Sequence, residues 1–175
     1  MSRPTPRCDL PALAHHLTCA RYGYALDVPA GWYSEPVQGT PRVSGDCLAH
    51  PSDTGDTSAS FTQDKSRSGF AEVVGAKKEK PRGQIAALLK LVPIPAAHVR
   101  YASVARHGAT FTVVENTYSG KTSNGTLYKI YLLMGSARHR GVPLMFFGVV
   151  TVLKNPDAAT QIAALKGAFA SFHFI

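Results

Sequence analysis

Two neighbouring stretches decide the fold: "TLYKIYLLMGSA" (residues 126–137) and "VPLMFFGVVTVLK" (residues 142–154). In the first, both faces of a strand are largely apolar. One face carries Tyr128, Ile130, Leu132 and Met134, and the other carries Leu127, Tyr131 and Leu133. The second stretch is apolar on both faces as well. Strands of this kind are buried on both sides, so we expect two central strands of a sheet with a packed layer on each face.

Two further strand-like segments precede this pair: "HVRYASVARHG" (98–108) and "ATFTVVENTYS" (109–119). The four segments are separated by "HG", "SGKTSNG" and "RHRG". These connections are hairpin-like, because their Gly and Asn residues readily supply the positive φ angles of tight turns. The sequence therefore predicts an antiparallel meander over residues 98–154.

A first amphipathic helix is predicted from Lys80, with Pro81 in its first turn and Pro93 beyond its end. Its residues at i, i+3, i+4 and i+7 form one apolar stripe. They are Ile85, Leu88, Leu89 and Val92. A helix with a single apolar stripe packs on a sheet or on another helix, and here the sheet is the neighbour we expect.

A second helix is predicted near the end of the sequence, with Asn155 as its cap and Pro156 as its first residue. Its apolar stripe consists of Ile162, Leu165, Phe169 and Phe172. With one helix for each face of a two-faced sheet, the predicted fold class is α+β: an α/β/α sandwich with a central antiparallel sheet flanked by helices.

The first part of the chain is less regular. Residues 9–18 have leucines at helical spacing, and "YALDV" (24–28) alternates as a half-buried strand does. A Pro-, Gly- and Ser-rich region (35–69) contains only weak strand signals, and "GFAEVVGAKK" (69–78) reads as a further strand. We expect a single domain over residues 1–175, with a helical extension (1–21) before the core (22–175).

Trp32, the only tryptophan, follows the strand exit at Pro29 and Gly31. We expect it to cover the sheet edge, since a large aromatic usually adds buried area to a core. A ligand-stacking role is the alternative, so Trp32 and the adjacent Tyr33 are candidate binding residues.

The charge is strongly basic and unevenly distributed. Nineteen Lys and Arg against eleven Asp and Glu give a formal net charge of +8, and over residues 91–175 the two classes number eight and two. Such a surface favours acidic proteins or other anionic ligands, anionic lipid head groups, or nucleic acid through long-range attraction. The candidate binding residues are Arg100, Lys121, Lys129, Arg138 and Arg140, with Tyr131 as an aromatic among them.

Catalytic signatures are not found. The sequence lacks the nucleophile-elbow, zinc-helix and phosphate-loop motifs. Asp53 begins an Asp-Thr-Gly triplet, and Asp46, Asp53 and Asp56 could offer oxygens to a cation, but the spacing of a calcium loop is missing. We therefore predict no catalytic residues, no metal site and no cofactor. A small hydrolase or metal protein is the alternative.

Three cysteines, Cys8, Cys19 and Cys47, form no metal-binding pair. A disulfide between Cys8 and Cys19 is possible in an oxidising compartment, and three free thiols in a reducing one. No stretch approaches the roughly 18 apolar residues of a membrane span. The start of the sequence lacks a signal-peptide core, so either the protein is cytoplasmic or its leader is absent here. The three clustered cysteines and the basic pI favour a periplasmic or secreted protein, with the cytoplasm as the alternative.

Three segments resemble the PsbP-like superfamily: "YALDVPAGW" (24–32), "ATFTVVENTYSGKTSNGTLYKIYLLM" (109–134) and the helix that leads into "SFHF" (171–174). Together they frame residues 22–175. The resemblance implies an α/β/α sandwich around an antiparallel sheet. Members include the extrinsic subunit of the photosynthetic oxygen-evolving complex, a Ran-binding import factor, bacterial lipoproteins and adaptors for secreted effectors, most of which bind rather than catalyse.

This resemblance and the absence of a catalytic constellation predict a non-enzymatic protein-binding or adaptor protein of bacterial type. Its partner would be another protein, held by the sheet face or adjoining loops. The alternative is a basic-surface binder of an anionic ligand or nucleic acid, with nucleic acid the less favoured partner because no RNA-recognition motif is present.

Overall fold

A computed structural model describes residues 16–34, 42–44, 47–52, 55–63, 66–75, 80–92 and 94–175. Its large antiparallel sheet has the strand order β4-β5-β6-β7-β11-β10-β9-β8, with β3 paired to β6. The strands are β3 (Tyr33–Ser34), β4 (Arg42–Ser44), β5 (Cys47–Ser52), β6 (Gly55–Thr62), β7 (Gly69–Gly75), β8 (Ala102–Arg106), β9 (Ala109–Lys121), β10 (Leu127–His139) and β11 (Val142–Thr151).

The predicted meander is confirmed as β8 to β11. The two strands with apolar residues on both faces, β10 and β11, pair in the middle of the sheet, with Met134 opposite Phe147. The start of the meander differs from the prediction: residues Ala96–His98 form a short 3-10 turn, η1, and the first strand begins at Ala102. Positive φ angles at His107 and Gly108 form the tight turn between β8 and β9.

Helix α1 (Pro81–Leu89) covers one face of the sheet. Ile85, Leu88 and Leu89 pack in one buried cluster with Leu132 and Met134 of β10 and with Met145 of β11. The helix is shorter than predicted, because at Leu91 and Val92 the backbone bonds switch to the tighter i−3 pattern. The predicted stripe is nonetheless the face that packs on the sheet.

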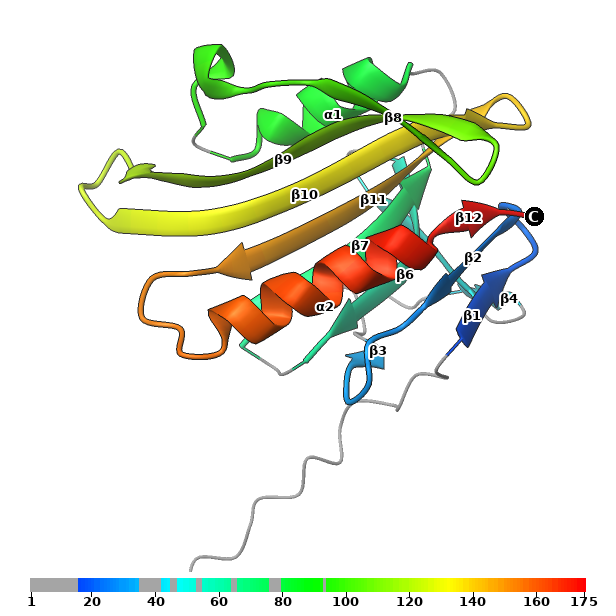
Figure 1. Ribbon diagram of the computed structural model, residues 1–175, viewed down its shortest axis with the longest axis horizontal. Helices are drawn as coiled ribbons and strands as arrows, with labels where there is room; N and C mark the ends of the chain where they lie inside the picture. Colours follow the sequence, from blue (N-terminus) through cyan, green and yellow to red (C-terminus); the bar gives the residue numbers. More distant parts are fainter. Residues whose placement is uncertain are drawn as a thin grey trace, which may run out of the picture.

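Helix α2 (Ala158–Ser171) covers the other face together with a small antiparallel sheet of order β1-β2-β12, as Figure 1 shows. The small sheet consists of β1 (His16–Cys19), β2 (Tyr24–Asp27) and β12 (His173–Phe174). Leu165, Phe169 and Phe172 are buried, as the predicted stripe requires. The α/β/α arrangement is therefore confirmed, with a small sheet added beside α2.

Helix α2 lies on a track of three glycines, one on each of three adjacent strands. A Cβ atom on Gly135 of β10 would collide with the ring of Phe169. On Gly148 of β11, it would lie 2.9 Å from Cδ1 of Leu165. Gly69 of β7 similarly lies under Gln161 of the helix. The missing side chains let α2 approach the sheet closely.

The small sheet corrects the N-terminal prediction. Residues 16–18 lie in strand β1 rather than in a helix, because Leu17 and Cys19 point inward while His16 is exposed, the period of two expected for a strand. β1 pairs with β2 across a turn that uses Gly23 at positive φ. The rest of the predicted helix lies outside the described residues.

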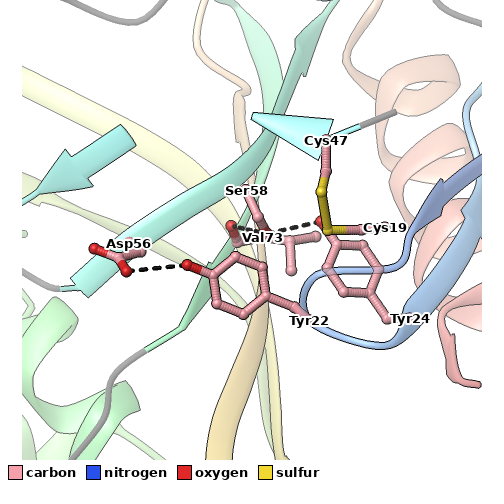
Figure 2. Close-up of a disulfide and its surroundings, with 7 residues drawn as sticks. All are labelled: Cys19, Tyr22, Tyr24, Cys47, Asp56, Ser58 and Val73. Carbon is pink, nitrogen blue, oxygen red and sulfur yellow. Dashed lines mark hydrogen bonds between the residues drawn. A yellow bond between two sulfur atoms is a disulfide. The ribbon is translucent and has the colours of Figure 1, made fainter. Parts of the chain in front are cut away.

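Three links tie the small sheet to the large one (Figure 2). A disulfide joins Cys19 of β1 to Cys47 of β5, with 5.1 Å between the Cα atoms. The predicted Cys8–Cys19 pairing is therefore wrong, because the fold places β5 beside β1; Cys8 lies outside the described residues. Tyr24 shares a 2.7 Å hydrogen bond with Ser58 of β6, and Tyr22 donates to Asp56 at 3.0 Å.

A glycine substitution tests the track under α2. We expect Gly135→Ala to lower the free energy of unfolding by about 1 to 3 kcal/mol, because the added methyl group forces the ring of Phe169 out of its position. Urea denaturation measures the change. Gly167→Ala is the matched control: it lies inside α2 with open space at its Cβ, so it should stabilise the protein by about 0.5 to 1 kcal/mol. If the two variants changed the free energy of unfolding by the same amount, the close contact between α2 and Gly135 would be contradicted.

The disulfide closes a loop of 28 residues in sequence separation. We expect Cys19→Ser, or Cys47→Ser, to lower the free energy of unfolding by about 3 to 4 kcal/mol, chiefly through the greater entropy of the unfolded chain. The measurement is urea denaturation of the wild type with and without reductant. A reductant that destabilises the wild type but leaves Cys19→Ser unchanged supports the bond; no effect on either contradicts it.

Candidate functional site

A groove lies between α1 and the segment that follows it. We call it the α1 groove; its volume is about 380 Å³ and its lining residues are Arg82, Ala86, Leu89, Lys90, Ile94, Ala96, Val99 and Tyr101. The contributions from α1 fall at i, i+4, i+7 and i+8, which places them on one side of the helix. Leu89, Ile94 and Val99 form its apolar walls, and Arg82 and Lys90 are the charged side chains among the lining residues that the structure describes.

Arg82 is held at this groove by an aromatic ring. Its guanidinium carbon lies 4.1 Å from the ring centroid of Tyr101, a cation–π contact. Within the described residues, this guanidinium has no hydrogen-bond or ion-pair partner. A guanidinium fixed by stacking keeps its N–H donors at its edge, in the geometry that binds a carboxylate or phosphate with two hydrogen bonds.

Leu91 lies next in the chain to Lys90 of the groove and is 69% exposed. It is the most exposed of the large apolar side chains in the described part of the chain. Protein-binding surfaces commonly combine an apolar centre with an arginine that can bind a carboxylate. The α1 groove, Leu91 and Arg82 together have this composition.

A buried glutamine fixes α1 against the sheet. Gln84 Nε2 donates to the carbonyl of Val74 at 2.9 Å, and its Oε1 accepts from the hydroxyl of Ser136 at 2.7 Å. Gln84 and Ser136 are 1% and 0% exposed. Since every buried polar atom of the pair is used, the contact fixes the position of the helix and with it one wall of the groove.

The basic residues predicted as one binding surface lie in three places. Arg100 is exposed beside the α1 groove and donates to the carbonyls of Ala97 and Val99. Lys121 and Lys129 are exposed near the hairpin that joins β9 to β10, where they line a second, shallow hollow of about 420 Å³.

Arg138 and Arg140 are at the opposite end of β10, and Arg140 donates to the carbonyl of Ile175 at 3.0 Å. Lys129 and Arg138 are nine positions apart along β10, a distance of about 30 Å. The predicted cations therefore do not share one surface.

The predicted aromatic binding residues are mostly in the core. Trp32 is 4% exposed and packs edge-to-face on Phe61, with 6.0 Å between ring centroids, so it adds buried area to the core and its ring is not exposed for stacking on a ligand. Tyr33 is partly exposed at the start of the short strand β3.

Tyr131 was predicted to bind and is instead 4% exposed, with its hydroxyl donating to Glu115 at 2.8 Å. Burial and the Glu115 carboxylate both raise the pKa of Tyr131, so the phenol keeps its proton. Tyr118 is also buried. Neither ring is therefore exposed for stacking on the bases of a single-stranded nucleic acid.

The acidic candidates form no site in the described residues. Asp46 and Asp53 lie outside them, and the carboxylate of Asp56 accepts a hydrogen bond from Tyr22. Across the described part of the chain, no three His, Cys, Asp or Glu side chains are grouped so that they could hold a metal ion. Nor does any described helix combine the length and apolar character needed to cross a membrane.

Known structures identify the fold. The solution structure of cyanobacterial PsbP (CyanoP) from Synechocystis sp. PCC 6803 matches with a TM-score of 0.54 and 14% identity, over 100% of this chain and 99% of that one. The chain has the PsbP-like fold that its sequence predicted. At this identity the likeness establishes the fold alone.

A crystal structure from Bacteroides thetaiotaomicron VPI-5482 matches 87% of this chain and 45% of that one, with 12% identity and a TM-score of 0.38, which is too low to establish a shared fold. No protein-family model matches the chain. No curated protein sequence matches it either.

Removal of the buried glutamine tests how α1 is positioned. We expect Gln84→Ala to lower the free energy of unfolding by about 1 to 3 kcal/mol, because it removes the bond to the Val74 carbonyl and leaves the Ser136 hydroxyl buried without its Gln84 partner. Chemical denaturation measures this. The double variant Gln84→Ala with Ser136→Ala no longer has the Ser136 hydroxyl that the single Gln84→Ala variant leaves unpaired. Its loss in free energy of unfolding should therefore be smaller than the sum of the losses in the two single variants. Strict additivity would contradict the coupling.

Proposed function

We propose that this protein is a non-enzymatic accessory protein that binds another protein through the α1 groove. The observation that carries the proposal is the stacked Arg82 in an apolar groove whose described lining residues include no carboxylate. The complementary partner segment has an apolar side chain for the groove and a neighbouring carboxylate for Arg82. The PsbP-like fold is compatible with this role, but it does not identify the partner.

The proposed location is outside the cytoplasm, in the bacterial periplasm or secreted. The support is the Cys19–Cys47 disulfide, whose residues are 0% and 1% exposed. Disulfides of this structural kind persist in oxidising compartments and are rare in the cytosol. Enzymatic activity is not part of the proposal, since the described polar side chains near the groove include no nucleophile paired with a base.

The test is affinity purification of the full chain from a detergent-solubilised extract of its native host, at low and at high salt. We expect one stoichiometric protein to be retained, and Arg82→Ala to weaken its binding by about 2 kcal/mol, roughly 30-fold in Kd, as for a central interface arginine. Ala86→Trp should abolish binding by filling the groove. Arg140→Ala, an exposed arginine that contacts Ile175 beside the small sheet on the other face, is the matched control and should bind as the wild type does.

Two results would overturn the proposal. One is retention of the partner by both groove variants with unchanged affinity, which would place the interface elsewhere. The other is the absence of any stoichiometric partner together with turnover of a substrate by the purified protein, which would make the protein an enzyme.

A further inference from the structure

A second surface, away from the α1 groove, lies at the end of the β9–β10 hairpin. We call it the tip patch and define it as Lys121, Leu127, Lys129, Leu153 and Lys154. Lys121 pairs with Leu127 across the hairpin, and Lys129 follows two residues after Leu127, so the three side chains share one face. The backbone of Leu153 donates to the carbonyl of Lys129, which brings the turn after β11 to the same place.

The tip patch projects from the body of the protein. In Figure 1 the hairpin between β9 and β10 extends beyond the end of β11 and beyond α2, at the left of the view. The hollow between the hairpin and Leu153 is shallow and is lined by Ser119, Gly120 and Tyr128 besides four residues of the patch. This shape suits a broad surface better than a single inserted side chain.

The tip patch exposes apolar side chains that are not buried in the core of the protein. Leu127 and Leu153 are 60% and 40% exposed, and they are two of the four large apolar side chains that are exposed in the described part of the chain. The other two, Leu91 and Ile175, lie elsewhere in the sequence. Apolar side chains gathered on a projecting tip indicate a surface that is covered in use.

The charged side chains of the tip patch itself, Lys121, Lys129 and Lys154, are all positive. Between Glu115 and Asp157 the sequence has five Lys and Arg residues and no acidic residue. The nearest carboxylates in the sequence are Glu115, which faces Lys166 at 3.3 Å, and Asp157, three residues after Lys154. Within the described residues, no ion pair involves Lys121, Lys129 or Lys154.

From this geometry we propose that the tip patch docks on a membrane surface that contains anionic phospholipids. The leucines would enter the boundary between headgroups and acyl chains, and the lysine amines would contact lipid phosphates at the end of their flexible stems. A projecting tip with exposed leucines and unpaired lysines fits a lipid interface better than the groove-shaped contact of a bound peptide. The inference does not depend on the proposed protein partner, because the two surfaces share no residue.

The test is co-sedimentation of the purified full chain with vesicles of phosphatidylcholine alone, or with about one third phosphatidylglycerol, at low and high salt. Binding to the anionic vesicles, weakened by salt, is expected. Each lysine near an anionic surface raises the partition coefficient of the protein onto the vesicles by a factor of about five. The double variant Lys121→Gln with Lys129→Gln should therefore lower this coefficient about 25-fold. Leu127→Ser with Leu153→Ser should lower it about tenfold, since it removes the inserted apolar groups.

The matched controls are Leu91→Ser and Arg138→Gln, which remove an exposed leucine and an exposed cation away from the patch. They should sediment as the wild type does, and so should Arg82→Ala, which keeps this test separate from that of the protein partner. No binding to anionic vesicles, or equal binding by patch and control variants, would overturn the proposal. Capture of an acidic protein through the patch residues, without vesicle binding, would also overturn it and assign the patch to a protein.

Discussion

Close contact between α2 and the glycines of the central sheet is the constraint on which the rest of the structure depends. Because Gly135 and Gly148 have no side chains, Phe169 and Leu165 can lie directly against β10 and β11. The helix then ends where Phe172 enters a cluster of aromatic rings. This cluster contains Phe111, Phe146, Phe169, Phe172 and Phe174.

The placement of α2 in turn determines where the small sheet forms. The chain leaves the helix at Phe172 and its next two residues become β12, which pairs with β2. β2 carries β1, and β1 carries Cys19 to within bonding distance of Cys47. The disulfide and the Tyr24–Ser58 hydrogen bond add to the β12–β2 pairing in holding the small sheet against the large one, and the core on this face is continuous from α2 to the N-terminal strands.

The central architecture could be predicted from the sequence because its signals are local. The apolar residues on both faces of β10 and β11 require two covering layers, and the two helical stripes supply one for each face. The predictions that were wrong, the N-terminal helix and the disulfide pairing, concerned features that depend on contacts between residues distant in the sequence. Leu17 has helical spacing from earlier leucines, yet pairing with β2 made its segment a strand. The partner of Cys19 could not be chosen from spacing, since several pairings of three cysteines fit any sequence.

The candidate site was predicted less well than the fold for a related reason. Exposure decides whether an aromatic or a cation can bind a partner, and exposure of Trp32 or Tyr131 depends on what packs over each strand face. The sequence did contain a usable signal for the groove: Arg82, Ala86 and Lys90 form a second stripe on α1, beside the apolar one that packs on the sheet. The apolar stripe of α1 packs on the sheet, and the second stripe faces the segment from Ile94 to Tyr101, which forms the other side of the groove.

The β9–β10 hairpin connects the two surfaces that the proposals concern. Both strands are 13 residues long, against 10 for β11, so the hairpin extends past its neighbour and leaves its tip uncovered. Alternation along β10 directs Tyr128 and Ile130 to the face that α1 covers, while Leu127 and Lys129 point to the other face. A protein docked on a membrane through the tip patch would therefore have its α1 groove on the opposite face of the same sheet, free to receive a partner.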